Sequence, residues 1–210
     1  MNLTIKKKLL AGLMSVCLLT LALGTFALMR MSAMNSHTQE IVDNWMPSIQ
    51  KIGALRFKVT QVRTYQYRYL ISDQSDLAQQ ETEFEKRHQE VAEAQKAYEP
   101  LIAAAEERAN YEAFKTNYAQ LLSQEKKFLE LKRVGKESEA REMMMGAMKE
   151  TFDNSTAALT KGVEYNAAQG EAAGKSSVAA NSSAFYWTLA IMVVAVALGL
   201  AIGLWLSNAI

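Results

Sequence analysis

Two uncharged stretches decide the architecture of this chain. Leu9 to Met29 reads LLAGLMSVCLLTLALGTFALM, and Phe185 to Leu206 reads FYWTLAIMVVAVALGLAIGLWL. As a helix, each stretch would be about 30 Å long, which is the hydrocarbon thickness of a bilayer. We therefore predict transmembrane helices at residues 9–29 and 185–206. They would hold the domain between them, residues 30–184, to a membrane at both ends.

The charges beside the first stretch predict its orientation. Three lysines, Lys6 to Lys8, precede it, and only Arg30 follows it closely. The positive-inside rule places residues 1–8 in the cytoplasm, so residues 30–184 are exported and residues 207–210 return to the cytoplasm. A cleaved signal peptide is the alternative. The apolar run is, however, longer than the roughly 7–15 residues of a typical signal-peptide core.

The composition of residues 30–184 is typical of long helices. Pro47 and Pro100 are the only prolines, glycine is sparse, and Ala, Glu, Gln, Lys, Leu and Met dominate. The single cysteine, Cys17, lies in the first stretch, so the exported domain has no disulfide. It holds 20 Lys and Arg against 22 Asp and Glu, a net charge of −2. This balance gives no indication of nucleic-acid binding.

Hydrophobic periodicity predicts four helices in this domain. The first runs to about Ser72, the second over residues 76–101 and the third over 106–133. The fourth starts near 137 and need not break before the second apolar stretch. The fold class that follows is all-α, an antiparallel up-down-up-down four-helix bundle flanked by two transmembrane helices.

Local signals mark the ends of these helices. Asn44 to Pro47 predicts an irregularity in the first helix, because proline lacks a backbone donor. Gly135 suits a left-handed cap after the third helix. The second helix repeats one apolar residue every seven positions, at Leu77, Phe84, Val91 and Tyr98.

Four segments carry a resemblance to a known family: MNLTIKKKLL at the start, Asn44-Trp45-Met46-Pro47-Ser48, RYLISD near Ser72, and EERANYEAFKTNYAQLL in the third helix. In these segments and in its architecture, the chain resembles the sensor half of bacterial methyl-accepting chemotaxis receptors. The resemblance implies a homodimeric receptor of the inner membrane, whose periplasmic four-helix bundle binds a ligand for chemotaxis. Residues 207–210 look like the start of a HAMP linker. Contact with cytoplasmic signalling proteins would require a region beyond it.

The first helix of the bundle is unusual in charge. From Asn44 to Ser72 there is no Asp or Glu, but there are five cations: Lys51, Arg56, Lys58, Arg63 and Arg68. One interpretation is a solvated face that pairs with acids on neighbouring helices, such as those of residues 81–85. The other is an anion site. Arg56 and Arg63 lie at the margin of the apolar stripe, where a guanidinium needs an anion, and a bound carboxylate matches the planar fork of arginine.

Arg63 and Arg68 are separated by about 140° around a helix, so one helix cannot easily direct both at one small anion. Two copies packed across a dimer axis could do so. The aspartate-sensing members of the resembled family use such an arrangement, but their third arginine would fall at Ser72 here. We therefore expect a different small organic anion, a di- or tricarboxylate or an amino acid. The candidate ligand-binding residues are Arg56, Thr60, Arg63, Tyr67, Arg68 and Thr151.

No catalytic constellation, metal-binding spacing or cofactor motif is evident, so we expect neither an enzyme nor a cofactor. His37 and His88 are isolated in the sequence and are expected to be surface or packing residues. The acidic residues are expected on solvated helix faces. Two alternatives remain open: the sensor of a histidine kinase or cyclase, and a membrane-tethered interaction bundle that binds no ligand.

Overall fold

The computed structural model describes the backbone of residues 5–207 and the side chains of residues 10–204. The predicted linker beyond Ser207 lies outside the described residues. By its internal contacts, the described chain divides into two compact units. The bundle unit comprises Val42–Gly170, and the span unit comprises the helical segments on either side of it.

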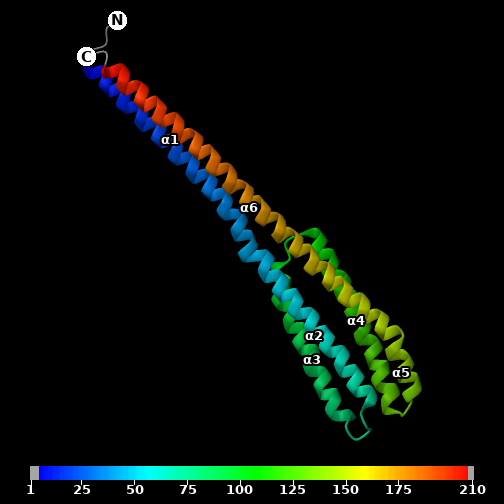
Figure 1. Cartoon of the computed structure of the whole chain (residues 1–210). Coiled ribbons are helices and arrows are strands. Elements are labelled where there is room, and N and C mark those ends of the chain that lie inside the picture. The colour runs from blue at the N-terminus through cyan, green and yellow to red at the C-terminus, as the bar shows by residue number, and fades with distance from the viewer. Residues whose placement is uncertain (1–4, 208–210) are drawn as a thin grey trace. The chain divides into compact units, whose positions relative to one another are not determined.

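The bundle unit is built from antiparallel helices joined by short connections, as Figure 1 shows. No strand occurs in the part of the chain that the structure describes. The prediction of an all-α up-down-up-down bundle is confirmed. The helices are α2 (Met46–Ile71), α3 (Leu77–Tyr98), α4 (Ala105–Arg133), α5 (Glu137–Met145) and the first part of α6 (Ala147–Ser207).

Gly135 ends α4 in the left-handed conformation that the sequence predicted, with φ of 75°. Its N–H donates to the carbonyl of Lys132 at 3.1 Å, and the N–H of Lys136 donates to the carbonyl of Leu131 at 2.9 Å. These two bonds form a Schellman cap, which satisfies carbonyls that a helix end otherwise leaves free.

The first helix is irregular where the sequence predicted it. A π-helical turn, Ile41–Trp45, separates α1 (Ile5–Glu40) from α2, and Pro47 occupies the first turn of α2. Proline is tolerated there because the first N–H groups of a helix have no partner within the helix.

The sequence shows no clear stop within the fourth helix, but the structure breaks it once. α5 ends at Met145 and α6 begins at Ala147, with Gly146 between them at φ −99° and ψ −103°. Glycine reaches such a conformation readily because it has no Cβ. The break is only one residue long, since the N–H of Gly146 still donates to Glu142 and its carbonyl accepts from Glu150.

The core of the bundle follows alternating steps of three and four residues on each helix, the pattern of facing helices in a bundle. The repeat of seven on α3 is confirmed, since all four of its apolar residues are buried. On α2 the buried positions in this register are Ser48, Ile52, Leu55, Val59, Val62, Gln66 and Tyr69. Two of them are polar, so the core is not purely apolar.

In the span unit, α1 lies beside the C-terminal part of α6 (Figure 1). The hydroxyls of Thr38 and Ser177 are 3.3 Å apart, and a Cβ at Gly174 would lie 3.9 Å from the Ile41 side chain. Two helical stretches, Leu10–Ile71 and Glu137–Leu204, are long and apolar enough to cross a membrane by length and composition. The most apolar segment of each stretch has no buried residue, as expected of a surface that faces lipid.

Candidate functional site

The cations of α2 are mostly without acidic partners. Lys58 pairs with Glu90 of α3 at 3.0 Å. Among the described residues, no carboxylate lies within 4.0 Å of the other four, which are Lys51, Arg56, Arg63 and Arg68. Pairing with neighbouring acids therefore accounts for Lys58 alone.

Arg63 lies inside the bundle, with 5% of its surface exposed. Its Nη1 donates to Gln66 Oε1 at 3.1 Å, and its Nη2 donates to the backbone carbonyl of Met144 at 2.8 Å. Its guanidinium carbon is 4.9 Å from the centroid of the Tyr67 ring and 5.7 Å from that of Phe152. The buried cation is thus held by neutral acceptors and aromatic faces.

Gln66 connects Arg63 to a buried polar chain that crosses three helices. Its Nε2 donates to Glu125 Oε2 of α4 at 2.8 Å, and Glu125 Oε1 is 2.6 Å from His88 Nε2 of α3. His88 Nδ1 is 2.9 Å from the hydroxyl of Tyr118. We call the five residues Arg63, Gln66, Glu125, His88 and Tyr118 the polar chain.

The polar chain agrees with one expectation and corrects another. His88 is a packing residue, and it contacts a carboxylate and a phenol. Glu125 is 4% exposed and does not follow a solvated face. Burial, and secondarily the Glu125 carboxylate, raise the pKa of the Tyr118 phenol above its usual value. Tyr118 therefore stays protonated, and its hydroxyl can donate to a bare Nδ1 of His88 or accept from a protonated one.

A second buried carboxylate lies elsewhere in the bundle. Glu107 is fully buried; its Oε1 accepts from Tyr98 Oη at 2.7 Å and from Asn166 Nδ2 at 2.9 Å, and its Oε2 accepts from the N–H of Ala103 at 3.1 Å. These bonds tie α3, α4 and α6 together. Like Glu125, Glu107 was expected on a solvated face, and that expectation is wrong.

A signal for both glutamates was present in the sequence. They continue the three- and four-residue steps of the apolar core on α4. The buried positions in this register are Glu107, Tyr111, Phe114, Tyr118, Leu121, Glu125, Phe128 and Lys132. An acidic residue in a core register indicates a buried polar contact, whatever the number of acids elsewhere.

The outward face of α2 carries a second register, which we call the α2 seam. Its residues alternate steps of four and three and include no charge: Met46, Gln50, Gly53, Phe57, Thr60, Thr64, Tyr67 and Ile71. All are exposed except Gly53, which is half-buried. Phe57 is 59% exposed and Ile71 is 82% exposed. An uncharged heptad seam is the kind of surface that packs against another helix.

The predicted site residues are only partly brought together. Arg63 and Tyr67 are in contact, as described above. Arg68 is exposed, and its guanidinium lies 5.2 Å from the Tyr65 ring, on a different side of α2. The separation of Arg63 and Arg68 around the helix is therefore as the sequence indicated.

The other three candidates form hydrogen bonds with groups other than Arg63. Arg56 is exposed and donates to Thr160 Oγ1 of α6 at 3.2 Å. Thr60, on the α2 seam, donates to the carbonyl of Arg56 at 2.9 Å. Thr151 is 4% exposed and donates to the carbonyl of Ala147 at 3.0 Å.

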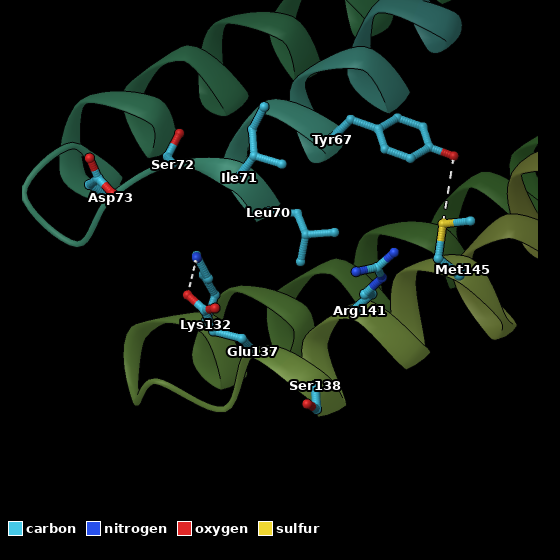
Figure 2. A pocket seen from close by; sticks show the side chains of 10 residues that line it. All are labelled: Tyr67, Leu70, Ile71, Ser72, Asp73, Lys132, Glu137, Ser138, Arg141 and Met145. Carbon is cyan, nitrogen blue, oxygen red and sulfur yellow. Dashed lines mark hydrogen bonds and ion pairs between the residues drawn. The ribbon is translucent and has the colours of Figure 1, made fainter.

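A pocket of about 700 Å³ opens where α2 ends and α5 begins. We call it the tip pocket; it is lined by Tyr67 and residues 70–73, by Lys132, and by residues of α5. Figure 2 shows Arg141 of α5 and Leu70 of α2 directed toward each other across it. The Tyr67 hydroxyl, 3.9 Å from Met145 Sδ, closes one end. The sequence did not indicate Arg141 because its neighbourhood depends on the α2–α5 contact.

No group of His, Cys, Asp and Glu side chains in the described residues could hold a metal ion. A family model described as a four helix bundle sensory module for signal transduction matches residues 2–180. Among curated proteins, no match to this chain was found.

Proposed function

Since this chain belongs to the family of four-helix-bundle sensory modules for signal transduction, we propose that it is the sensor of a bacterial chemoreceptor. In this proposal residues 9–29 and 185–206 cross the inner membrane, and residues 30–184 form the periplasmic domain. The domain is a homodimer that binds a small organic anion, and binding is reported to the cytoplasm.

The observation that carries this proposal is the charge distribution on α2. The helix has five cations and no acid, and its outward seam is uncharged. The exposed side chains of Phe57 and Ile71 would be removed from water if a second copy packed on the seam. Apart from Lys58, which pairs with Glu90, the cations of α2 would then lie without carboxylates to neutralise them.

The heptad register places two arginines opposite each other in such a dimer. With Thr64 and Tyr67 on the seam, Arg63 and Arg68 occupy the flanking positions on either side. In a parallel pair of helices, the residue directly before a seam position, here Arg63, faces the residue five positions later on the other helix, here Arg68. Arg63 of one copy would thus face Arg68 of the other, and a bound carboxylate would relieve the repulsion between them.

The structure suggests different roles for these arginines. Arg68 is exposed and free to contact an anion directly, whereas Arg63 lies beneath the ring of Tyr67. In the proposal, Arg68 and the seam hydroxyls of Thr60 and Tyr67 touch the ligand, and Arg63 supplies positive potential from below. Arg56 lies two turns before Arg63 on α2. Thr151 is buried and takes at most an indirect part in ligand binding.

A signal could leave the site through α6. This helix runs from Ala147 to Ser207, so residues of the bundle and of the second apolar stretch share one helix. An anion that favours one placement of the bundle helices would shift the population of α6 positions. The resembled receptors are thought to use a small piston-like slide, and we propose the same here.

Ligand binding can be tested on the whole chain in phospholipid nanodiscs. Calorimetry against di- and tricarboxylates and amino acids should detect an anion that binds. Arg68→Ala should weaken that binding about tenfold or more, the loss of one charge-assisted hydrogen bond. Arg108→Ala, an exposed arginine on α4, is the matched control. Absence of binding, or equal losses in both variants, would contradict the anion site.

The dimer can be tested by cross-linking. In a Cys17→Ser background, Thr64→Cys places one thiol per chain on the α2 seam. If two seams pack in parallel, mild oxidation of the membranes should yield disulfide-linked dimers. Gln89→Cys, on an exposed face of α3, should not cross-link. Equal cross-linking of the two variants would refute the proposed interface.

A further inference from the structure

The tip pocket contains a guanidinium that the bundle leaves without a partner. Arg141 is exposed and makes no hydrogen bond or ion pair with any residue that the structure describes. Its side chain is nevertheless directed into the pocket, between Leu70 and the contact of Tyr67 with Met145 (Figure 2). This arrangement differs from a solvated arginine, whose side chain points away from the protein.

The charges of the pocket are distributed unevenly. Lys132 is 3% exposed and paired with Glu137 at 2.7 Å, so its charge is already balanced. The buried cation Arg63 lies behind Tyr67, 4.9 Å from its ring centroid, and also has no carboxylate partner. The end near Arg141 is therefore positive. The acidic residues, Asp73 and Glu137, lie toward the other end (Figure 2).

The surfaces beside Arg141 are apolar. Leu70 is half-buried, and the Tyr67 ring and the Met145 thioether are 42% and 49% exposed. All three side chains line the pocket, so their apolar surfaces face water when no ligand is bound. An apolar group placed there would displace this water and gain contacts with all three side chains.

We propose that the tip pocket binds an amphipathic monocarboxylate within a single copy of the chain. The carboxylate pairs with Arg141 in the bidentate manner that guanidinium favours. The apolar body of the ligand packs on Leu70, Tyr67 and Met145. A second carboxylate on the same ligand would point toward Asp73 and be repelled. The site goes beyond the α2 seam and does not depend on a dimer, although Tyr67 and Ile71 belong to both.

The test uses the whole chain in phospholipid nanodiscs with pentanoate, benzoate, acetate and succinate as probes. Pentanoate and benzoate should bind more tightly than acetate, which lacks the apolar body, and than succinate, which has a second charge. Arg141→Gln should weaken pentanoate and benzoate about tenfold or more. Arg108→Gln is the matched control and should leave both affinities unchanged.

A second readout locates the ligand. Saturating benzoate should slow hydrogen exchange of the amides of α5 and the last turn of α2, and this protection should be absent in Arg141→Gln. Because Arg141 has no partner among the residues that the structure describes, the exchange pattern of Arg141→Gln without ligand should match that of the parent. Binding that survives Arg141→Gln, or tighter binding of succinate than of pentanoate, would overturn the proposal.

The two proposed sites can fail separately. Arg68→Gln should leave pentanoate and benzoate binding intact if the tip pocket is their site. If Arg68→Gln abolishes it and Arg141→Gln does not, the tip pocket is refuted and the α2 seam is supported. If Arg141→Gln weakens the binding of every probe that binds and Arg68→Gln weakens none, the tip pocket is supported and the seam site is refuted.

Discussion

Replacing Gln66 with leucine tests the polar chain most directly. Gln66 is fully buried; it accepts from Arg63 at 3.1 Å and donates to Glu125 at 2.8 Å. Leucine has a similar size but can make neither bond. The substitution therefore leaves one donor of a buried guanidinium and one acceptor of a buried carboxylate without partners.

The expected cost follows from these two losses. Each hydrogen bond to a charged group contributes about 1.5–3 kcal/mol, and the added apolar surface of leucine returns about 1–2 kcal/mol. A net destabilisation of about 3 kcal/mol remains. Glu125 keeps its contact with His88, and Arg63 keeps the carbonyl of Met144, so the full cost of two orphaned charges is not reached.

Gln61→Leu is the matched control on the same helix. The Oε1 atom of Gln61 is buried and has no hydrogen-bond partner among the described residues. Removing an unpartnered polar atom from a buried place costs nothing and can be stabilising. We expect Gln61→Leu to lie between no change and a gain of about 1 kcal/mol. Glutamine to leucine should thus lower the free energy of unfolding at position 66 but not at position 61.

Native-state hydrogen exchange measures both variants in the whole chain. A loss of 3 kcal/mol raises the exchange rate of the most protected amides of α2 and α4 by about 100-fold when reclosing is fast. Gln61→Leu should leave these rates unchanged or lower them. If Gln66→Leu exchanges like the parent, or if both variants lose protection equally, the energetic role of the polar chain is refuted.

Three further predictions concern single contacts in the bundle. Glu107→Ala removes the acceptor of three hydrogen bonds, from Tyr98, Asn166 and the N–H of Ala103, and should lower the free energy of unfolding by about 3–6 kcal/mol. Glu112→Ala, at an exposed glutamate of the same helix, should change it by less than about 0.5 kcal/mol; urea unfolding compares the two variants. The hydrogen bond from Arg133 lowers the pKa of Glu81. The ionised Glu81 carboxylate therefore stabilises the fold above the unfolded pKa of about 4.3, and this stabilisation is lost as the pH falls through the lower folded pKa. Glu81→Gln should therefore lower the melting temperature at pH 7 and flatten its decline below about pH 4; equal slopes for parent and variant would contradict this. Gly135→Ala should cost about 1–2 kcal/mol because φ is positive there, and Gly135→Asn should cost less; thermal melts that rank them in reverse would exclude strain as the cause.

The α2 seam and the buried registers show which core positions a sequence pattern can predict. Spacing on α2 predicted that Ile52 and Val59 face the core, and both are buried. The same spacing included Gln66 but did not show that its side chain contacts Glu125 of α4. Hydrophobicity identifies apolar core positions only, so a polar residue in the register is overlooked until its partner on another helix is known.

The amino-acid sequence by itself determined the two apolar stretches, the four helices, the left-handed turn at Gly135 and the absence of acids on α2. These features depend on residues that are close together in the chain, so composition and spacing are sufficient to predict them. The hydrogen bond of Arg63 to Met144 and the position of Arg141 beside Leu70 depend instead on residues more than 70 positions apart, across the interface of α2 with α5.

Only the tertiary structure decided which charges are partnered. It joined Arg63, Gln66 and Glu125, which are buried, to the partly buried His88, and it left Arg141, in the lining of a pocket, without a partner among the described residues. The physical reason is that a charge is neutralised by what lies within a few ångströms in space. In a bundle of antiparallel helices, those neighbours come from other helices and are far apart in the sequence.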